Sequence, residues 1–297
     1  MRRKFLCGLA ASLGAASLEA QSVPARDLWE FPLGAILQPA ALSTEPAGGL
    51  WNPAAHGLKS GERIRLGVTS LSASSDQGVG GQMLGIVFRQ RDNRTFGISV
   101  ARSAIEGVVR TDSDPQAIGE VPYSSLIVSA TATRQVLPNI DVGLGIRWRE
   151  GRVDEEVRHA LAADLGLVAT HLPLRDARIG VSSFLWRPGR EIEDRPSVLV
   201  AVDASVYAKG TNEFRAGYSY HAVNRGSREY GPYMLTRLDR FEANVGVLAI
   251  TSFGRRVNRI RSGVALRYAS YIVGVGREEG ISGLGPLYQF TLSSTVR

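Results

Sequence analysis

The sequence has 297 residues and a formal net charge of +7, and only three of its 35 basic residues are lysines. It contains one cysteine, Cys7, so it has no disulfide framework and no Cys-based metal site. The arginines are scattered along the chain and mixed with acidic residues, whereas a nucleic-acid-binding protein gathers its basic residues on one face. We therefore expect no nucleic acid among its partners.

The first 20 residues have the pattern of a secretory signal peptide. A basic start, Met1 to Lys4, precedes an apolar stretch from 5 to 18, and Ala20 offers a small-residue cleavage site. The apolar stretch is too short for a transmembrane helix. We predict export and a mature chain that begins at Gln21 and lacks the cysteine. The alternative is a basic N-terminus without structure.

Residues 21–61 show neither helical nor strand periodicity, but they contain a rigid turn that carries an aromatic residue. Gly48 and Gly49 precede Leu50-Trp51-Asn52-Pro53. Asn-Pro favours a turn, and a proline keeps the residue before it out of the helical region. Glycines allow the backbone to approach another surface closely. The alternative is a surface loop with one buried aromatic residue.

Apolar and polar residues alternate with a period of two about twelve times after residue 62, which predicts β-strands. The clearest runs are 140–149, 241–249, 260–272 and 286–293. Weaker runs are 62–74, 80–91, 94–105, 123–136, 159–171, 175–187, 196–208 and 212–223. The polar face of these runs carries glycine, serine, alanine, arginine and acids, with almost no lysine. Small residues and paired charges suit the narrow interior of a barrel better than the surface of a soluble sheet.

The connections mostly alternate between long and short. The long ones are 106–122, 150–158, 187–196 and 224–239, and the short ones are 91–94, 135–139, 171–174 and 209–212. Outer-membrane barrels have short periplasmic turns and longer external loops. We therefore predict an all-β fold, in which residues 62–297 form a single antiparallel up-and-down transmembrane β-barrel of about twelve strands, with fourteen as the alternative count, and with both termini in the periplasm. A soluble two-sheet sandwich is the alternative.

The sequence has little that indicates catalysis. Gly-x-Ser-x-Gly, His-Glu-x-x-His and P-loop motifs are absent. The histidines lie far apart, at His56, His159, His171 and His221. The acidic runs 154–156 and 191–194 contain calcium-ligand types, but adjacent arginines favour ion pairs. We expect no catalytic residue, no metal and no cofactor, with a hydrolase site assembled in space as the alternative.

Trp51-Asn52-Pro53-Ala54-Ala55 resembles the aromatic-Asn-Pro-Ala-Gly motif near the N-terminus of FadL-like outer-membrane barrels. This family includes long-chain fatty-acid transporters and the related PorV and PorQ proteins of type IX secretion. In the family the motif follows a short segment inside the lumen, and the barrel commonly has fourteen strands. This chain departs from the family at Ala55-His56-Gly57, where Gly-Leu-Ala is usual, and at Val296-Arg297, where an aromatic residue is usual.

The resemblance implies that residues 21–61 are a lumenal plug and that the protein is an outer-membrane channel for small hydrophobic molecules. The plug or ligand-binding residues would be Leu50, Trp51, Asn52, Pro53 and Leu58. The alternative function is a PorV-like or PorQ-like accessory barrel that receives exported proteins and transports nothing, and a purely structural barrel is the third. The partners expected are outer-membrane lipid and either hydrophobic small molecules or a protein of a secretion system.

Overall fold

The computed structural model describes residues 37–56, 62–73, 78–90, 93–111, 117–186, 197–223, 228–252, 255–279 and 285–296. The predicted signal peptide, residues 1–20, lies outside this part of the chain, as do Leu58 and the predicted loop 187–196. Among the described residues, no helix has the length and the apolar character that crossing a membrane requires.

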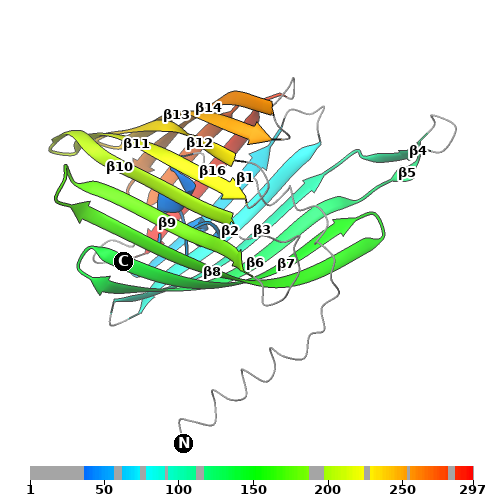
Figure 1. The fold of residues 1–297 in the computed structure, drawn as a ribbon, viewed down its shortest axis with the longest axis horizontal. Helices are drawn as coiled ribbons and strands as arrows, with labels where there is room; N and C mark the ends of the chain where they lie inside the picture. The colour runs from blue at the N-terminus through cyan, green and yellow to red at the C-terminus, as the bar shows by residue number, and fades with distance from the viewer. Residues whose placement is uncertain are drawn as a thin grey trace, which may run out of the picture.

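The described strands form one closed antiparallel barrel of fourteen (Figure 1). They are β1 (Ile64–Ser72), β2 (Val79–Gln90), β3 (Arg94–Ile105), β6 (Tyr123–Leu137), β7 (Ile140–Val153), β8 (Glu156–Leu172), β9 (Ala177–Trp186), β10 (Ser197–Lys209), β11 (Asn212–Val223), β12 (Arg228–Leu238), β13 (Phe241–Ser252), β14 (Arg255–Tyr268), β15 (Tyr271–Glu278) and β16 (Leu287–Val296). Each strand pairs with the next in this order, and β1 closes the barrel by pairing with β16. The predicted fold class is confirmed.

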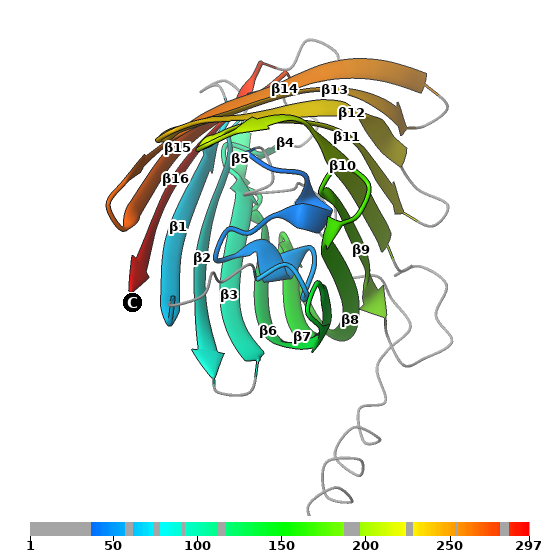
Figure 2. The same ribbon diagram turned by 90° about the vertical axis from the view of Figure 1, so that its left-hand side faces the viewer.

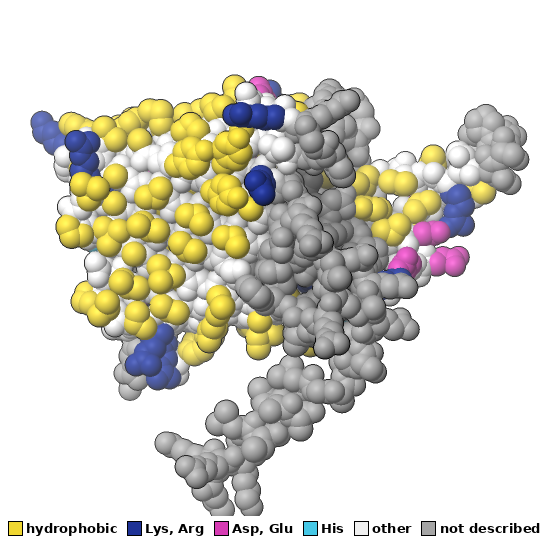
Figure 3. All heavy atoms as spheres, viewed as in Figure 1, with side chains coloured by type: hydrophobic (Ala, Val, Ile, Leu, Met, Phe, Trp, Pro, Cys, Tyr) yellow, Lys and Arg dark blue, Asp and Glu magenta, His cyan; other side chains and the backbone are white. Residues whose placement is uncertain are grey.

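Side chains alternate between the lumen and the outer surface, as the sequence pattern predicts. On β7, Ile146 points outward and is 64% exposed, whereas its neighbour Arg147 points into the lumen and is 2% exposed. Hydrophobic side chains cover the outer wall over most of its height (Figure 3). Since closure also leaves no unpaired sheet edge, this wall meets both requirements for contact with lipid.

The two ends of the barrel differ. At one end, called the turn end, short turns follow β2, β6, β8, β10, β12 and β14, and β1 begins and β16 ends there. The opposite end, called the loop end, carries the connection between β3 and β6. That connection contains a separate two-stranded sheet of β4 (Val109–Thr111) and β5 (Ala117–Glu120), which extends beyond the barrel (Figure 1).

Two strands are absent from the sequence prediction. β12 lies inside the predicted loop 224–239, and the predicted run 260–272 is divided between β14 and β15 by a turn at Ala269 and Ser270. Ala269 has a positive φ of 52°, which a non-glycine residue rarely adopts, so the sequence carries no turn signal there. These two strands account for the difference between twelve and fourteen.

The predicted long loop 150–158 is instead the end of a hairpin. β7 continues to Val153 and β8 begins at Glu156, so the connection is a two-residue turn. The charges that suggested a loop lie along extended strands. Arg158 forms an ion pair with Glu156, and Arg110 of β4 forms one with Asp154.

Residues 37–56, called the plug, lie inside the ring of strands (Figure 2). The plug contains two short 3-10 turns, η1 (Ala40–Leu42) and η2 (Gly48–Leu50). η1 contacts β9 and β10, whereas η2 contacts β3 and β6 on another part of the wall. The plug therefore extends across the lumen from one side of the wall to another.

Candidate functional site

The plug is folded around the Asn52 side chain, which is fully buried. Its Nδ2 donates to the carbonyl of Ala41 at 2.7 Å, and its Oδ1 accepts from the backbone N–H of Ala54 at 3.0 Å. The first bond joins the two halves of the plug, and the second fixes the turn at Pro53. An asparagine fits this position because it is both a donor and an acceptor.

Three polar side chains from the wall hold successive parts of the plug backbone. Arg147 of β7 donates to the carbonyl of Leu50. Ser182 of β9 donates to the carbonyl of Trp51 at 2.6 Å, and Thr133 of β6 donates to the carbonyl of Pro53. A buried carbonyl without a partner costs free energy, so these side chains stabilise the docked plug against release.

Arg147 is itself positioned by an ion pair. Its Nη2 and Nε lie 2.7 Å and 3.0 Å from Oδ2 of Asp164 on the neighbouring strand β8. Both side chains are almost completely buried. A buried arginine needs such a partner, because the uncompensated charge would be costly in this environment.

The wall has glycines where the plug approaches it most closely. A Cβ atom at Gly143 of β7 would lie 2.3 Å from the carbonyl carbon of Pro53. A Cβ atom at Gly166 of β8 would lie 2.1 Å from Oδ1 of Asn52. No side chain can be accommodated at such distances, so the two glycines shape the wall for the Asn-Pro turn.

Apolar side chains of the plug pack against apolar side chains that point inward from the wall. Leu50 is 3% exposed and Trp51 is 8% exposed, and both belong to one buried cluster. Its members from the wall include Leu71, Met83, Ala101, Ile127, Leu199 and Leu287. The lumen is therefore apolar where the tryptophan docks.

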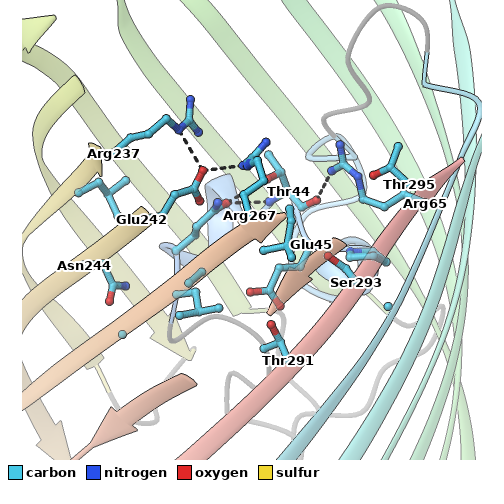
Figure 4. A pocket seen from close by; sticks show the side chains of 18 of the residues that line it. Thr44, Glu45, Arg65, Arg237, Glu242, Asn244, Arg267, Thr291, Ser293 and Thr295 are labelled. Carbon is cyan, nitrogen blue, oxygen red and sulfur yellow. Dashed lines mark hydrogen bonds and ion pairs between the residues drawn. The ribbon is translucent and has the colours of Figure 1, made fainter. Parts of the chain in front are cut away.

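A cavity of about 930 Å³ lies between the plug and the wall towards the turn end. Thr44 and Glu45 of the plug face it, together with residues of β13, β14 and β16 (Figure 4). Its apolar lining includes Leu37, Pro46 and Leu235. Leu50 and Trp51 are not among the residues that line this cavity.

Most of the charge in the cavity belongs to paired groups. Glu242 of β13 accepts from Arg237 at 2.9 Å and from Arg267 at 2.5 Å (Figure 4), and Arg237 also lies 4.0 Å from Glu213. A second cluster joins Arg215 and Arg178 through Asp203. These networks make part of the cavity wall charged, and Leu235 of the apolar lining lies opposite Arg215 in the register of β11 and β12.

Two titratable groups of the plug are buried without full hydrogen bonding. Oε1 of Glu45 has no hydrogen-bond partner in the described part of the chain, and burial raises the pKa of this carboxyl to about 8. Nε2 of His56 lies 2.5 Å from Oγ1 of Thr131, whereas its Nδ1 has no partner there. Burial, and then the charge of Arg65, lowers the pKa of His56 to about 4. Both groups are therefore neutral in the docked plug near neutral pH.

The structure brings together four of the predicted plug residues, Leu50, Trp51, Asn52 and Pro53, and all four are buried inside the barrel. The fifth, Leu58, lies outside the described residues. The wall residues that bind the plug, among them Arg147, Ser182 and Thr133, were not predicted. The period-2 pattern places all three on the inner face, but no pattern indicates which inward residues contact the plug.

The other candidates do not assemble into a site. His56 lies in the plug and His221 on β11, whereas His159 and His171 lie near opposite ends of β8, and His159 stacks on Trp148 with ring centroids 5.3 Å apart. The described residues contain no group of three or more side chains arranged to bind a metal ion. In the acidic run at 154–156, two of the carboxylates form the ion pairs described above.

No protein-family profile matches the chain, and no curated protein does. Among solved structures, the chain is similar to the outer membrane protein Omp33 of Acinetobacter baumannii, with a TM-score of 0.48, 10% identity, and coverage of 79% of this chain and 98% of that one. CdiB from Acinetobacter baumannii has a TM-score of 0.47 and 9% identity, and the match covers 79% of this chain and 60% of that one. A triple mutant of the Rhodopseudomonas blastica porin has a TM-score of 0.45 and 9% identity, and the match covers 78% of this chain and 99% of that one. These similarities are weak, so the fold assignment stands on the strand pairing itself.

Proposed function

We propose that the protein is an outer-membrane channel in which the plug, residues 37–56, controls passage. The observation that carries this proposal is the docking of the plug backbone on three wall side chains, Arg147, Ser182 and Thr133. These hydrogen bonds hold the plug against the wall, and no disulfide joins the two, because the one cysteine of the chain is Cys7. A segment held in this way can be released without unfolding the barrel.

The solutes we propose are small hydrophobic or amphiphilic molecules. Apolar inward side chains such as Leu71, Met83 and Leu199 belong to the same buried cluster as the docked tryptophan, so the lumen accepts apolar groups. The cavity on the turn side contains both apolar lining residues and the charged pairs around Glu242. An amphiphile matches both environments better than a sugar or an inorganic ion does. The proposal includes no catalytic step and no cofactor.

We further propose that the turn end lies in the periplasm and the loop end outside the cell. Short turns on the periplasmic side are the rule for outer-membrane barrels. Protease added to intact cells is expected to cut the connection at 106–122 and to leave the turn at 209–212 uncut. Cleavage at 209–212 alone would show that the barrel has the opposite orientation.

The transport proposal is tested by swelling of liposomes that contain the purified mature protein. Protein-containing liposomes should swell faster in isosmotic sodium butanesulfonate, a permanently charged amphiphile, than in glucose. Protein-free liposomes provide the background rate, and a heat-modifiable band on gels shows that the barrel is folded. A folded protein that gives only the background rate, even when Arg147→Gln weakens plug docking, would contradict a channel.

The accessory role is the second candidate, and the β4–β5 sheet supports it. This sheet extends beyond the loop end and exposes Val109 and Ile118, which are 51% and 64% exposed. Exposed apolar residues on a projecting hairpin are typical of a contact surface for another protein. Recovery of one defined protein partner in detergent, lost in a Val109→Ser, Ile118→Ser variant, would favour this role over transport.

A further inference from the structure

Two arginines lie directly opposite each other on the outer wall of the barrel, near the turn end. The register of β3 and β6 pairs Arg94 with Arg134. Both side chains are exposed. Thr133 of β6 and Gly97 of β3 face the lumen, and because Arg134 and Arg94 each lie an odd number of residues away from them, both arginines face outward. Like charges directly opposite each other destabilise an antiparallel pair.

The repulsion between these arginines has no counter-charge in the described part of the chain. No ion pair links an acidic side chain of the described residues to either Arg94 or Arg134. A cationic side chain on the lipid-facing surface is also unfavourable, although the cost falls near the headgroups. Figure 3 shows basic side chains at the border of the hydrophobic wall. The arrangement becomes favourable if an external anion lies between the two guanidinium groups.

The residues next to this pair form two rows around the barrel. In the row of the two arginines, Gln90 of β2 lies opposite Arg94, whereas Val142 of β7 lies opposite Arg134 and ends the polar part of the row. One step further into the wall, the corresponding row is apolar: Phe88, Phe96, Ala132 and Leu144. Phe88 and Phe96 are stacked, with ring centroids 5.6 Å apart. Three polar side chains on β2, β3 and β6 thus lie directly beside apolar ones on the outer wall.

The strand β6 offers a path for an acyl chain. Its outward residues Ala130 and Ala132 are small, whereas the residues opposite them are large. Ile98 and Phe96 lie on the β3 side, and Ile146 and Leu144 lie on the β7 side. A chain placed along β6 therefore contacts larger apolar side chains on both flanks.

We propose that Arg94 and Arg134 bind the phosphate of an anionic phospholipid, with one acyl chain lying along β6. Two guanidinium groups can each direct N–H donors to phosphate oxygens, which relieves their mutual repulsion. The choice of a phospholipid rests on the proposed orientation, because the periplasmic leaflet of an outer membrane consists of phospholipid. The channel activity and the lipid site are otherwise independent.

Native mass spectrometry of the detergent-purified mature protein tests this proposal. Phosphatidylglycerol should bind at least about tenfold more tightly than phosphatidylcholine, because the zwitterionic lipid carries a choline cation beside its phosphate. The Arg94→Gln, Arg134→Gln double variant should lose this preference. Lys209→Gln is the matched control, since Lys209 is a turn-end cation that lies opposite Asn212, and it should keep the preference.

Two further measurements keep the test decisive. The single variant Arg94→Gln removes the repulsion and leaves one guanidinium group, so it should fold at least as well as the parent and bind the anionic lipid more weakly. Inorganic phosphate at millimolar concentration should not displace the lipid. Equal binding of the two lipids, retention of the preference in a folded double variant, or saturation by inorganic phosphate alone would each overturn the phospholipid site.

Discussion

Nδ2 of Asn52 lies 2.7 Å from the carbonyl oxygen of Ala41, and this hydrogen bond joins the two ends of a plug segment inside the barrel. The same side chain accepts from the backbone of Ala54 and lies against Gly166 of the wall. Asn52 thus both stabilises the fold of the plug and contacts the wall that surrounds it.

Asn52→Asp should weaken plug docking although it is nearly isosteric. Aspartate keeps the acceptor for the N–H of Ala54, but it cannot donate to Ala41 and places a carboxylate against a carbonyl oxygen. Loss of a buried hydrogen bond of this kind costs about 1–3 kcal/mol. Liposome swelling should be faster with Asn52→Asp, while heat-modifiability is unchanged. A swelling rate equal to that of the parent would show that the Asn52 donor does not hold the plug.

Gly143→Leu should displace the plug. The added side chain would begin with a Cβ atom 2.3 Å from Pro53, and neither the strand backbone nor the rigid turn can move aside by enough. Gly119→Leu is the matched control, because a Cβ atom at this exposed position has no atom within 4 Å. Bilayer conductance should rise only in Gly143→Leu. Equal conductance of the two variants would contradict the close approach of plug and wall.

Trp51→Ala should loosen the plug without unfolding the barrel. The tryptophan is buried in an apolar cluster, and its truncation costs about 3 kcal/mol where the cavity cannot collapse. The barrel is held by strand pairs that do not involve Trp51. Protease protection of the plug in detergent should decrease, whereas the temperature at which the barrel band shifts on gels should stay the same. A large drop in that temperature would show that the barrel depends on the plug.

Plug docking should weaken as the pH rises from 6.5 to about 8. Burial raises the pKa of Glu45 to about 8 from an ordinary value near 4.5, so the docked plug binds a proton that the released plug has lost. Docking therefore loses stability across that interval. His56, whose pKa is lowered to about 4, acts only below pH 6.5, where its protonation favours release. Conductance should increase between pH 6.5 and 8 in the parent and stay constant in Glu45→Gln; a parallel increase in both would exclude Glu45.

The sequence was sufficient to predict the barrel, because outward-facing and lumenal residues alternate without interruption in most strands. The run from Ile140 to Trp148 has the same parity in β7 as in the prediction. β12 was missed because Gly231 and Pro232 interrupt its pattern. Proline has no N–H to donate, and the pairing of β12 with β13 omits both residues.

The plug site was only half predictable. The Trp51-Asn52-Pro53 turn stands out in the sequence, because its chemistry is local. Its partners are far away along the chain, and Ser182 is 131 residues from the Trp51 carbonyl that it binds. Such contacts depend on how the plug sits in the closed barrel, which the alternation of residues along single strands does not encode.

Single-channel recording in planar bilayers tests the central claim, that the plug closes this barrel, most directly. The mature protein should show a low conductance with rare openings, and a variant without residues 37–56 should show a large and steady one. Heat-modifiability of the deletion variant establishes that its barrel is folded. If the folded deletion variant and the parent have the same conductance, the segment does not close the lumen and the account is contradicted.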